Sequence, residues 1–261
     1  MSSLRSSVLL AGGIDPSGGA GLSVDGAAVR ALGLHPAPVC ALVTLQDGTR
    51  YVDARPVSAR LVFGALQMVA ERLAVKALKT GALGSAANVR AVVRFARQHR
   101  HIALVVDPVV RSTTAGALFD ASAVALLQRT LFPLATLVTP NLDEAELLTG
   151  LPCRTPDQMH RAAQALLAYG PRAVLLKGGH LDGPQLVDVL ALDDGTVRRF
   201  TASRLDVPEV RGTGCALASL CAGHIALGAS IEDAVQAAAG VLRDAMSRAS
   251  RVGDGPRVLS F

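Results

Sequence analysis

Two glycines and a cysteine stand together near the end of the chain, in the run Arg211-Gly212-Thr213-Gly214-Cys215. The residues that follow, 216–227, are apolar nearly all the way round, which predicts a buried helix. The first N–H groups of a helix have no intrahelical partners, and glycine lets a phosphate approach them closely. The helix dipole also lowers the pKa of a thiol in that turn. The run therefore predicts an anion cradle beside an activatable Cys215; a tight turn before a core helix is the alternative.

Polar residues follow several of the apolar segments that predict strands. Asp107 follows residues 102–106, Thr139 follows residues 136–138, and Glu144 comes five residues after Thr139. In a doubly wound α/β fold, ligands bind beyond the carboxyl ends of the strands. Mg²⁺ takes few protein carboxylates and several water and phosphate oxygens. These three residues therefore predict a metal and nucleotide site.

A lysine follows another predicted strand, residues 174–176, in the stretch Lys177-Gly-Gly-His180. An ammonium at that place can reach a transferring phosphate. The alternative is an exposed loop lysine. Phosphoryl transfer depends mainly on charge stabilisation and positioning, so a lysine and a glycine cradle together favour that chemistry.

The glycine-rich loop at residues 11–21 matches neither common nucleotide-binding motif. A Walker A loop requires a lysine, and none occurs before residue 76. The dinucleotide fingerprint requires a third glycine where Val24 stands. The loop instead leads to Asp25, which is either a cap or a ligand-facing carboxylate, and Gln46 ends the next strand. A carboxylate and an amide together can read an aminopyrimidine edge, although each alone is an ordinary polar loop residue.

Predicted strands alternate with predicted helices, which is typical of a doubly wound α/β fold. We expect helices at residues 22–32, 61–73, 86–99, 121–131, 143–148, 156–169, 216–227 and 231–250. We expect strands at residues 8–10, 39–45, 75–79, 102–106, 136–138 and 174–176, and a hairpin at residues 186–201. No linker interrupts the pattern, so we predict one domain, residues 1–261, with a central mostly parallel sheet and helices on both faces.

Composition narrows the possible partners. The net charge is +5, but the basic residues lie on predicted helix faces and are not interleaved with aromatic residues, which argues against nucleic-acid binding. The four cysteines lack metal-ligand spacing and predict a reducing cytoplasm. The N-terminal apolar run is too short for a signal peptide or a membrane span.

As a set, these motifs resemble the hydroxymethylpyrimidine/phosphomethylpyrimidine kinase family, the thiamine-biosynthetic member of the ribokinase superfamily. The similarity runs in order across nearly the whole chain. It rests on Asp15-Pro-Ser-Gly-Gly-Ala-Gly21, Asp25, Gln46, Thr139-Pro-Asn141 with Glu144, Lys177-Gly-Gly-His180 and Gly212-Thr-Gly-Cys215. The cysteine is the most specific feature, because sugar kinases and most pyridoxal kinases of the superfamily carry Asp there.

The resemblance implies a ribokinase-like fold and ATP- and Mg²⁺-dependent phosphorylation of 4-amino-5-hydroxymethyl-2-methylpyrimidine, and then of its monophosphate, to give the pyrophosphate. It implies that Cys215 is the base and that the N–H groups of residues 212–215 form the anion hole. It assigns Asp25, Gln46, Gly13 and Val109 to the pyrimidine, Lys177, Asn141 and Thr213 to ATP, and Asp107, Thr139 and Glu144 to Mg²⁺. A cytoplasmic homodimer is also expected.

The chain departs from the family pattern in three places. Gly13-Ile14-Asp15 replaces a Gly-Ser-Asp or Gly-Thr-Asp sequence, Arg111 stands where a lid lysine is usual, and Ala82 replaces a bulkier Met against the ring. Two alternatives stay open. One is a pyridoxal kinase, and the other is a non-catalytic relative that binds a pyrimidine.

Overall fold

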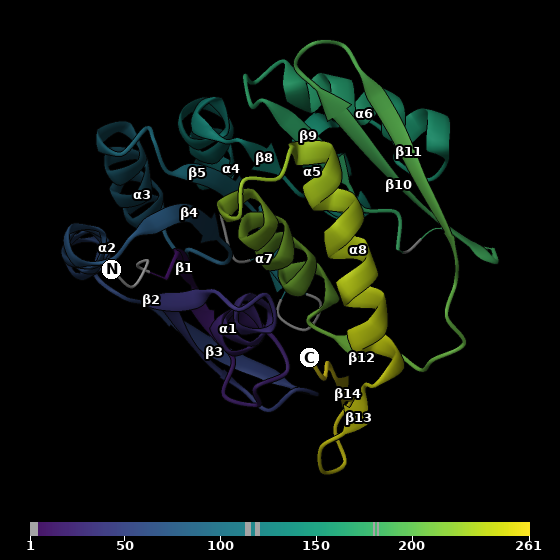
Figure 1. Cartoon of the computed structure of the whole chain (residues 1–261), viewed down its shortest axis with the longest axis horizontal. Coiled ribbons are helices and arrows are strands. Elements are labelled where there is room, and N and C mark those ends of the chain that lie inside the picture. Colours follow the sequence, from purple (N-terminus) through teal and green to yellow (C-terminus); the bar gives the residue numbers. More distant parts are fainter. Residues whose placement is uncertain (1–4, 113–115, 118–120, 180, 182) are drawn as a thin grey trace.

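A nine-stranded sheet runs through the middle of the computed structural model, which describes residues 5–112, 116–117, 121–179, 181 and 183–261 (Figure 1). The strand order is β11-β10-β9-β8-β5-β4-β1-β2-β3. The six strands from β9 to β2 run parallel, whereas β3, β10 and β11 each pair antiparallel with the strand that precedes them in the chain. The bounds are β1 Ser7–Ile14, β2 His35–Gln46, β3 Tyr51–Pro56, β4 Val75–Thr80, β5 Ala103–Val106, β8 Leu137–Val138, β9 Ala173–Leu176, β10 Gln185–Leu192 and β11 Val197–Ser203. The predicted mostly parallel sheet is confirmed.

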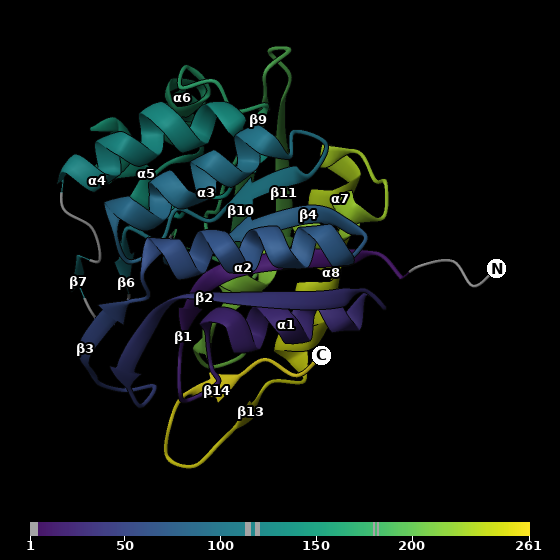
Figure 2. The same ribbon diagram turned by 90° about the vertical axis from the view of Figure 1, so that its left-hand side faces the viewer.

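Helices cover both faces of the sheet, as predicted (Figures 1 and 2). One layer holds α1 (Gly21–Ala31), α7 (Thr213–Ala226) and α8 (Ile231–Ser247), which pack on one apolar core. The other holds α2 (Ala59–Arg72), α3 (Ala86–Gln98), α4 (Ala121–Leu126), α5 (Leu142–Thr149) and α6 (Pro156–Leu167). Alternating strands and helices produce this arrangement because each crossover places a helix on one face of a parallel sheet.

Helix α7 is the most deeply buried element of its layer. It packs against α1, α8, β4 and β5, and eight consecutive residues from Ala216 to Gly223 are buried. Small side chains permit this close packing: a Cβ at Gly223 would lie 2.5 Å from a methyl carbon of Leu32. The prediction of a buried helix after the glycine run is confirmed.

Several details differ from the predicted elements. Strand β3 was not predicted, because Asp53, Arg55 and Pro56 make it a polar edge strand without an apolar run. A small sheet joins β12 (Val210–Arg211) to β14 (Arg257–Val258) and β13 (Ser250–Arg251), and its pairing links segments that are distant in the chain. The last helix ends at Ser247 rather than near 250, and α4 continues through a π-helical turn, Leu127–Leu131, and a 3₁₀ turn, Phe132–Leu134.

The carboxyl ends of the parallel strands meet at one edge of the sheet, because parallel neighbours end on the same side. The loops after β1, β4, β5, β8 and β9 all begin there. Among the described residues, none of the helices combines the length and apolar character that a membrane crossing requires.

Candidate active site

The glycine run forms the entry to α7. Gly212 precedes the helix with a left-handed backbone, φ 78°, and no side chain among the described residues caps the helix. A Cβ at Gly212 would lie 2.5 Å from the carbonyl oxygen of Gly19, so no larger residue fits. The first N–H groups of α7 are therefore left for an anion, and the positive end of the helix dipole favours one.

Lys177 lies beside this first turn. Its Nζ donates to Asp107 Oδ1 at 2.9 Å, and the hydroxyl of Thr139 donates to the same oxygen at 3.2 Å. A Cβ at Gly214 would lie 3.2 Å from that Nζ, which places the ammonium against the start of the helix. The Lys177 side chain is 12% exposed, whereas that of Asp107 is 3% exposed. The ends of β5, β8 and β9 thus bring a partly accessible ammonium to the glycine cradle.

Neighbouring charges keep this pair ionised. Burial opposes the charge of Lys177, but Asp107 and Glu144 outweigh it and hold its pKa above the ordinary value. Burial likewise opposes ionisation of Asp107, and the ammonium groups of Lys177 and Lys79 nevertheless hold its pKa below the ordinary value. An anion that reaches Lys177 therefore meets a protonated ammonium that is paired with Asp107.

Glu144 and Asn141 form a reciprocal cap at the start of α5. Glu144 Oε2 accepts from the backbone N–H of Asn141, and Asn141 Oδ1 accepts from the backbone N–H of Glu144, both at 2.8 Å. Sequence reasoning missed this structural role, although the Asn-x-x-Glu spacing signals it. Burial raises the pKa of Glu144 to about 8, with Lys177 acting against the shift and Asp107 adding to it.

The acidic groups of this edge suit a divalent cation shared with phosphates. The charge of Asp107 disfavours ionisation of Glu144, and a cation bound beside the two carboxyl groups would relieve that cost. Carboxylate and hydroxyl oxygens are the donors that Mg²⁺ prefers. The described residues contain no group of three or more acidic, His or Cys side chains placed for a metal, so phosphates and water would have to complete its coordination.

Asp25, which the family resemblance assigns to the pyrimidine, has an internal partner. Lys79 Nζ donates to both of its oxygens, at 2.8 and 2.9 Å, and the hydroxyl of Ser219 donates to one of them at 2.8 Å. Both charged side chains are 1% exposed. Burial opposes the charge of Lys79, but Asp25 holds the pKa of Lys79 above the ordinary value. Lys79 was missed; the available signal was a lysine near the end of β4, after the apolar residues Ala77 and Leu78 and directly before Thr80-Gly81.

Cys215 behaves differently from the prediction based on the helix dipole. Burial raises the pKa of its thiol to about 11. Lys79 and a hydrogen bond with the backbone of Gly21 act in the lowering direction but do not overcome it, while Asp107 and Asp25 add to the rise. The thiol is therefore protonated at neutral pH, because desolvation is the largest influence on its pKa.

Comparison with known proteins shows the family to which the chain belongs. A family model described as phosphomethylpyrimidine kinase matches residues 15–259. The hydroxymethylpyrimidine/phosphomethylpyrimidine kinase of Rhizobium meliloti (strain 1021) is 38% identical over 249 residues, which are 94% of this chain and 93% of that protein. The chain belongs to the phosphomethylpyrimidine kinase family.

Solved structures place the fold of this family member among vitamin kinases and confirm the predicted ribokinase-like architecture. The phosphomethylpyrimidine kinase of Clostridium difficile 630 is 30% identical with a TM-score of 0.81, and the match covers 92% of this chain and 99% of that one. A pyridoxal kinase from Staphylococcus aureus, solved with AMP-PCP and pyridoxal, is 25% identical with a TM-score of 0.88, covering 98% and 93%.

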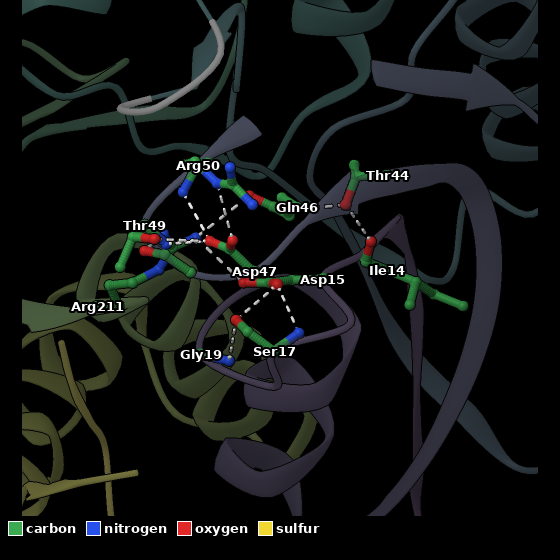
Figure 3. A network of polar contacts seen from close by, with 11 residues as sticks. Ile14, Asp15, Ser17, Gly19, Thr44, Gln46, Asp47, Thr49, Arg50 and Arg211 are labelled. Carbon is green, nitrogen blue, oxygen red and sulfur yellow. Dashed lines mark hydrogen bonds and ion pairs between the residues drawn. The ribbon is translucent and has the colours of Figure 1, made fainter. Parts of the chain in front are cut away.

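The residues predicted to hold the pyrimidine in this family lie at neighbouring strand ends. Gly13 pairs with Leu42 near the end of β1, and a Cβ there would lie 3.7 Å from the methyl group of Ala82. Val109 is half-buried and follows Asp107. Gln46 ends β2, and its amide donates to Thr44 Oγ1 at 2.9 Å (Figure 3). Whether these residues contact a ring stays a prediction.

Two segments of the family pattern fall wholly or partly outside the described residues. The backbone of β6 (Arg111–Ser112) pairs with β7 (Gly116–Ala117), but the Arg111 side chain and residues 113–115 are not described. His180 also lies outside the described residues. The prediction that Arg111 replaces the lid lysine therefore stays a prediction.

Proposed function

We propose that this chain transfers the γ-phosphoryl group of ATP to the hydroxymethyl group of 4-amino-5-hydroxymethyl-2-methylpyrimidine, and then phosphorylates the monophosphate to the pyrophosphate for thiamine biosynthesis. The observation that carries the proposal is the charged ammonium of Lys177, held by Asp107 against the first turn of α7. Membership of the phosphomethylpyrimidine kinase family supports the substrate.

In the transfer, the bond from the γ-phosphorus to the ADP oxygen breaks while a bond to the substrate oxygen forms. The transition state is loose, so stabilisation of the equatorial oxygens matters most. We assign that role to Lys177 and to the N–H groups of residues 212–215. Asn141 and Thr213 contact the nucleotide. Asp107, Thr139 and Glu144 are the residues that would hold a Mg²⁺ ion, which would supply further positive charge to the phosphates.

Cys215 is the group that we assign to take the hydroxyl proton. It takes this proton in its thiolate form, which is a minor fraction at neutral pH because burial raises its pKa to about 11, and the proton moves from the hydroxyl to Sγ as the bond to phosphorus forms. Prior deprotonation of the acceptor is therefore a minor part of catalysis, in keeping with a loose transition state. Lys79 and the backbone of Gly21 are the groups that stabilise a thiolate when it forms.

We propose that Gln46, Gly13 and Val109 surround the pyrimidine ring. The carboxylate of Asp25 is engaged by Lys79 and Ser219, so we assign it to holding Lys79 rather than to the ring. Ala82 beside Gly13 leaves more room than a Met would, which makes pyridoxal a reasonable second substrate. The structural likeness to a pyridoxal kinase favours the same second candidate.

We further propose that the enzyme is a cytoplasmic homodimer. The described cysteines are all free thiols, as a reducing compartment requires. Sedimentation equilibrium of the purified chain distinguishes a dimer from a monomer.

ADP release with MgATP tests the function directly. We expect kcat/KM for the hydroxymethylpyrimidine to exceed that for pyridoxal by at least tenfold, and omission of Mg²⁺ to abolish both. The pyrimidine monophosphate, offered separately, tests the second step. A higher kcat/KM for pyridoxal would reassign the enzyme, and no ADP release with any of the three would indicate a non-catalytic binding protein.

A further inference from the structure

One arginine joins the segments that the proposed function assigns to the pyrimidine and to the phosphate. Arg211 directly precedes Gly212 in the chain. Its guanidinium donates to Gly48 O, to Asp15 Oδ2 at 3.1 Å and to Gln46 Oε1 at 3.4 Å (Figure 3). One side chain thus contacts both the loop after β1 and the turn after β2.

The ion pair at the centre of this contact is largely shielded from water. The Arg211 side chain is 13% exposed and that of Asp15 is 2% exposed. Asp15 uses its other oxygen to order its own loop, accepting from the N–H of Ser17 at 2.9 Å and from the Ser17 hydroxyl at 2.7 Å. Removal of the arginine would leave a buried carboxylate without this counter-charge, so the loop depends on it.

The backbone extends the same connection to the anion cradle. Gly212 lies so close to Gly19 that a Cβ would meet the Gly19 carbonyl oxygen at 2.5 Å. A Cβ at Gly48 would lie 3.3 Å from the Ser17 hydroxyl. The loop at residues 15–19 is therefore packed between the cradle on one side and the turn at residues 46–50 on the other, and Arg211 bonds to both loop and turn.

The arginine also fixes the orientation of the Gln46 amide. A guanidinium can only donate, so the amide oxygen must face Arg211, and the amide nitrogen then donates to Thr44. Free rotation of the amide would exchange donor and acceptor in front of a ligand. With Arg211 in place, the pattern presented to a ring is set before the ring arrives.

We propose that Arg211 is a positioning residue, which orients Gln46 toward the pyrimidine and aligns the pyrimidine with the phosphate cradle at Gly212. The inference rests on the proposed function, because it requires that the pyrimidine lie at Gln46. Arg211 acts through substrate binding and does not contact the reacting atoms.

A double-substitution cycle with Gln46 tests the proposal. We expect Arg211→Met to raise the KM for the pyrimidine about tenfold, the cost of one lost charge-assisted hydrogen bond, with the KM for ATP changed less than about twofold. Arg211→Lys should recover part of the loss. In a Gln46→Ala background, Arg211→Met should have little further effect on the pyrimidine KM, because the amide that it orients is gone.

Arg50 provides the matched control. This arginine lies in the turn at residues 46–50, pairs with Asp47 and is 81% exposed. Arg50→Ala should leave both KM values unchanged. Amide hydrogen exchange without ligand gives an independent readout: Arg211→Met should speed exchange at residues 15–21 and 46–50, and Arg50→Ala should not speed it at residues 15–21.

The outcomes separate this inference from the function on which it rests. Absence of wild-type turnover with any pyrimidine would overturn both. Normal wild-type turnover with additive effects of the Arg211 and Gln46 substitutions, or an unchanged pyrimidine KM in Arg211→Met, would overturn the role of Arg211 alone.

Discussion

Two lysine–aspartate pairs lie at the same edge of the sheet, and they differ in what they leave accessible. Lys79 and Asp25 are both 1% exposed, and Ser219 bonds to the same carboxylate. Lys177 keeps 12% exposure beside Asp107 and lies against the first turn of α7. Similar ion pairs thus occupy a closed environment and a partly open one.

The difference shows how burial divides roles between identical residue types. A fully buried pair is isolated from ligands, and its charges act on the fold and on neighbouring groups such as Cys215. A partly open pair keeps an ammonium available for a phosphate. We therefore expect the first pair to control stability and the second to control phosphoryl transfer.

Substitution of Lys79 gives the largest expected effect. Lys79→Met leaves Asp25 buried without its counter-charge, which should lower the free energy of unfolding by about 3–5 kcal/mol. Adding Asp25→Asn should recover most of that loss. Urea unfolding measures both, and Lys76→Met, at the exposed second residue of β4, is the matched control. A loss below about 1 kcal/mol would contradict a stabilising role.

Substitution of Lys177 should act on turnover. Lys177→Ala removes the ammonium from the phosphate cradle, and loss of one such donor lowers kcat by about a hundred- to a thousand-fold. ADP release measures kcat. Arg172→Ala removes an exposed cation just before the same strand, β9, and should leave kcat unchanged. A Lys177→Ala variant with wild-type kcat would remove the distinction between the two pairs.

The thiol of Cys215, which lies near both lysine–aspartate pairs, is expected to react slowly with alkylating agents. Since the pKa of Cys215 is about 11, its thiolate fraction is small at neutral pH and grows with pH up to that value. Iodoacetamide labelling of the Cys215 peptide should therefore rise throughout the range from about pH 6 to 10, whereas a free thiol measured alongside levels off above about 8.5. A plateau near neutral pH would indicate that the helix end outweighs burial.

The smallest expected effect comes from one added methyl group. Gly214→Ala places a Cβ 3.2 Å from Lys177 Nζ, so the ammonium must move by a few tenths of an ångström. We expect kcat to fall about tenfold, since small misplacements are costly in phosphoryl transfer. Gly240→Ala in α8, where the new methyl group meets open space, is the control. An unchanged kcat would mean that the position of Lys177 is not critical.

The fold followed from local patterns, and this explains what could be predicted. The apolar strands each end in a polar or glycine-bearing loop, so the sheet edge that collects Asp107, Thr139 and Lys177 was predictable. The start of α7 was marked by glycines followed by an apolar run. Strand β3 could not be predicted in this way, because its residues carry no apolar alternation.

The parts of the site that were missed depend on partners far away in the chain. Lys79 bonds to a residue 54 positions away and Arg211 to one 196 positions away, and no local pattern encodes either pairing. The predicted direction of the Cys215 pKa shift was wrong for the same reason. Desolvation of that thiol comes from the packing of separate elements around α7, which only the folded chain shows.

A crystal structure with a non-hydrolysable ATP analogue, Mg²⁺ and the hydroxymethylpyrimidine tests the contrast between the two pairs most directly. We predict that the γ-phosphate contacts Lys177 Nζ and the first N–H groups of α7, while Lys79 stays bonded to Asp25. Phosphates bound away from α7, or a Lys79 that leaves Asp25 to contact them, would contradict the account.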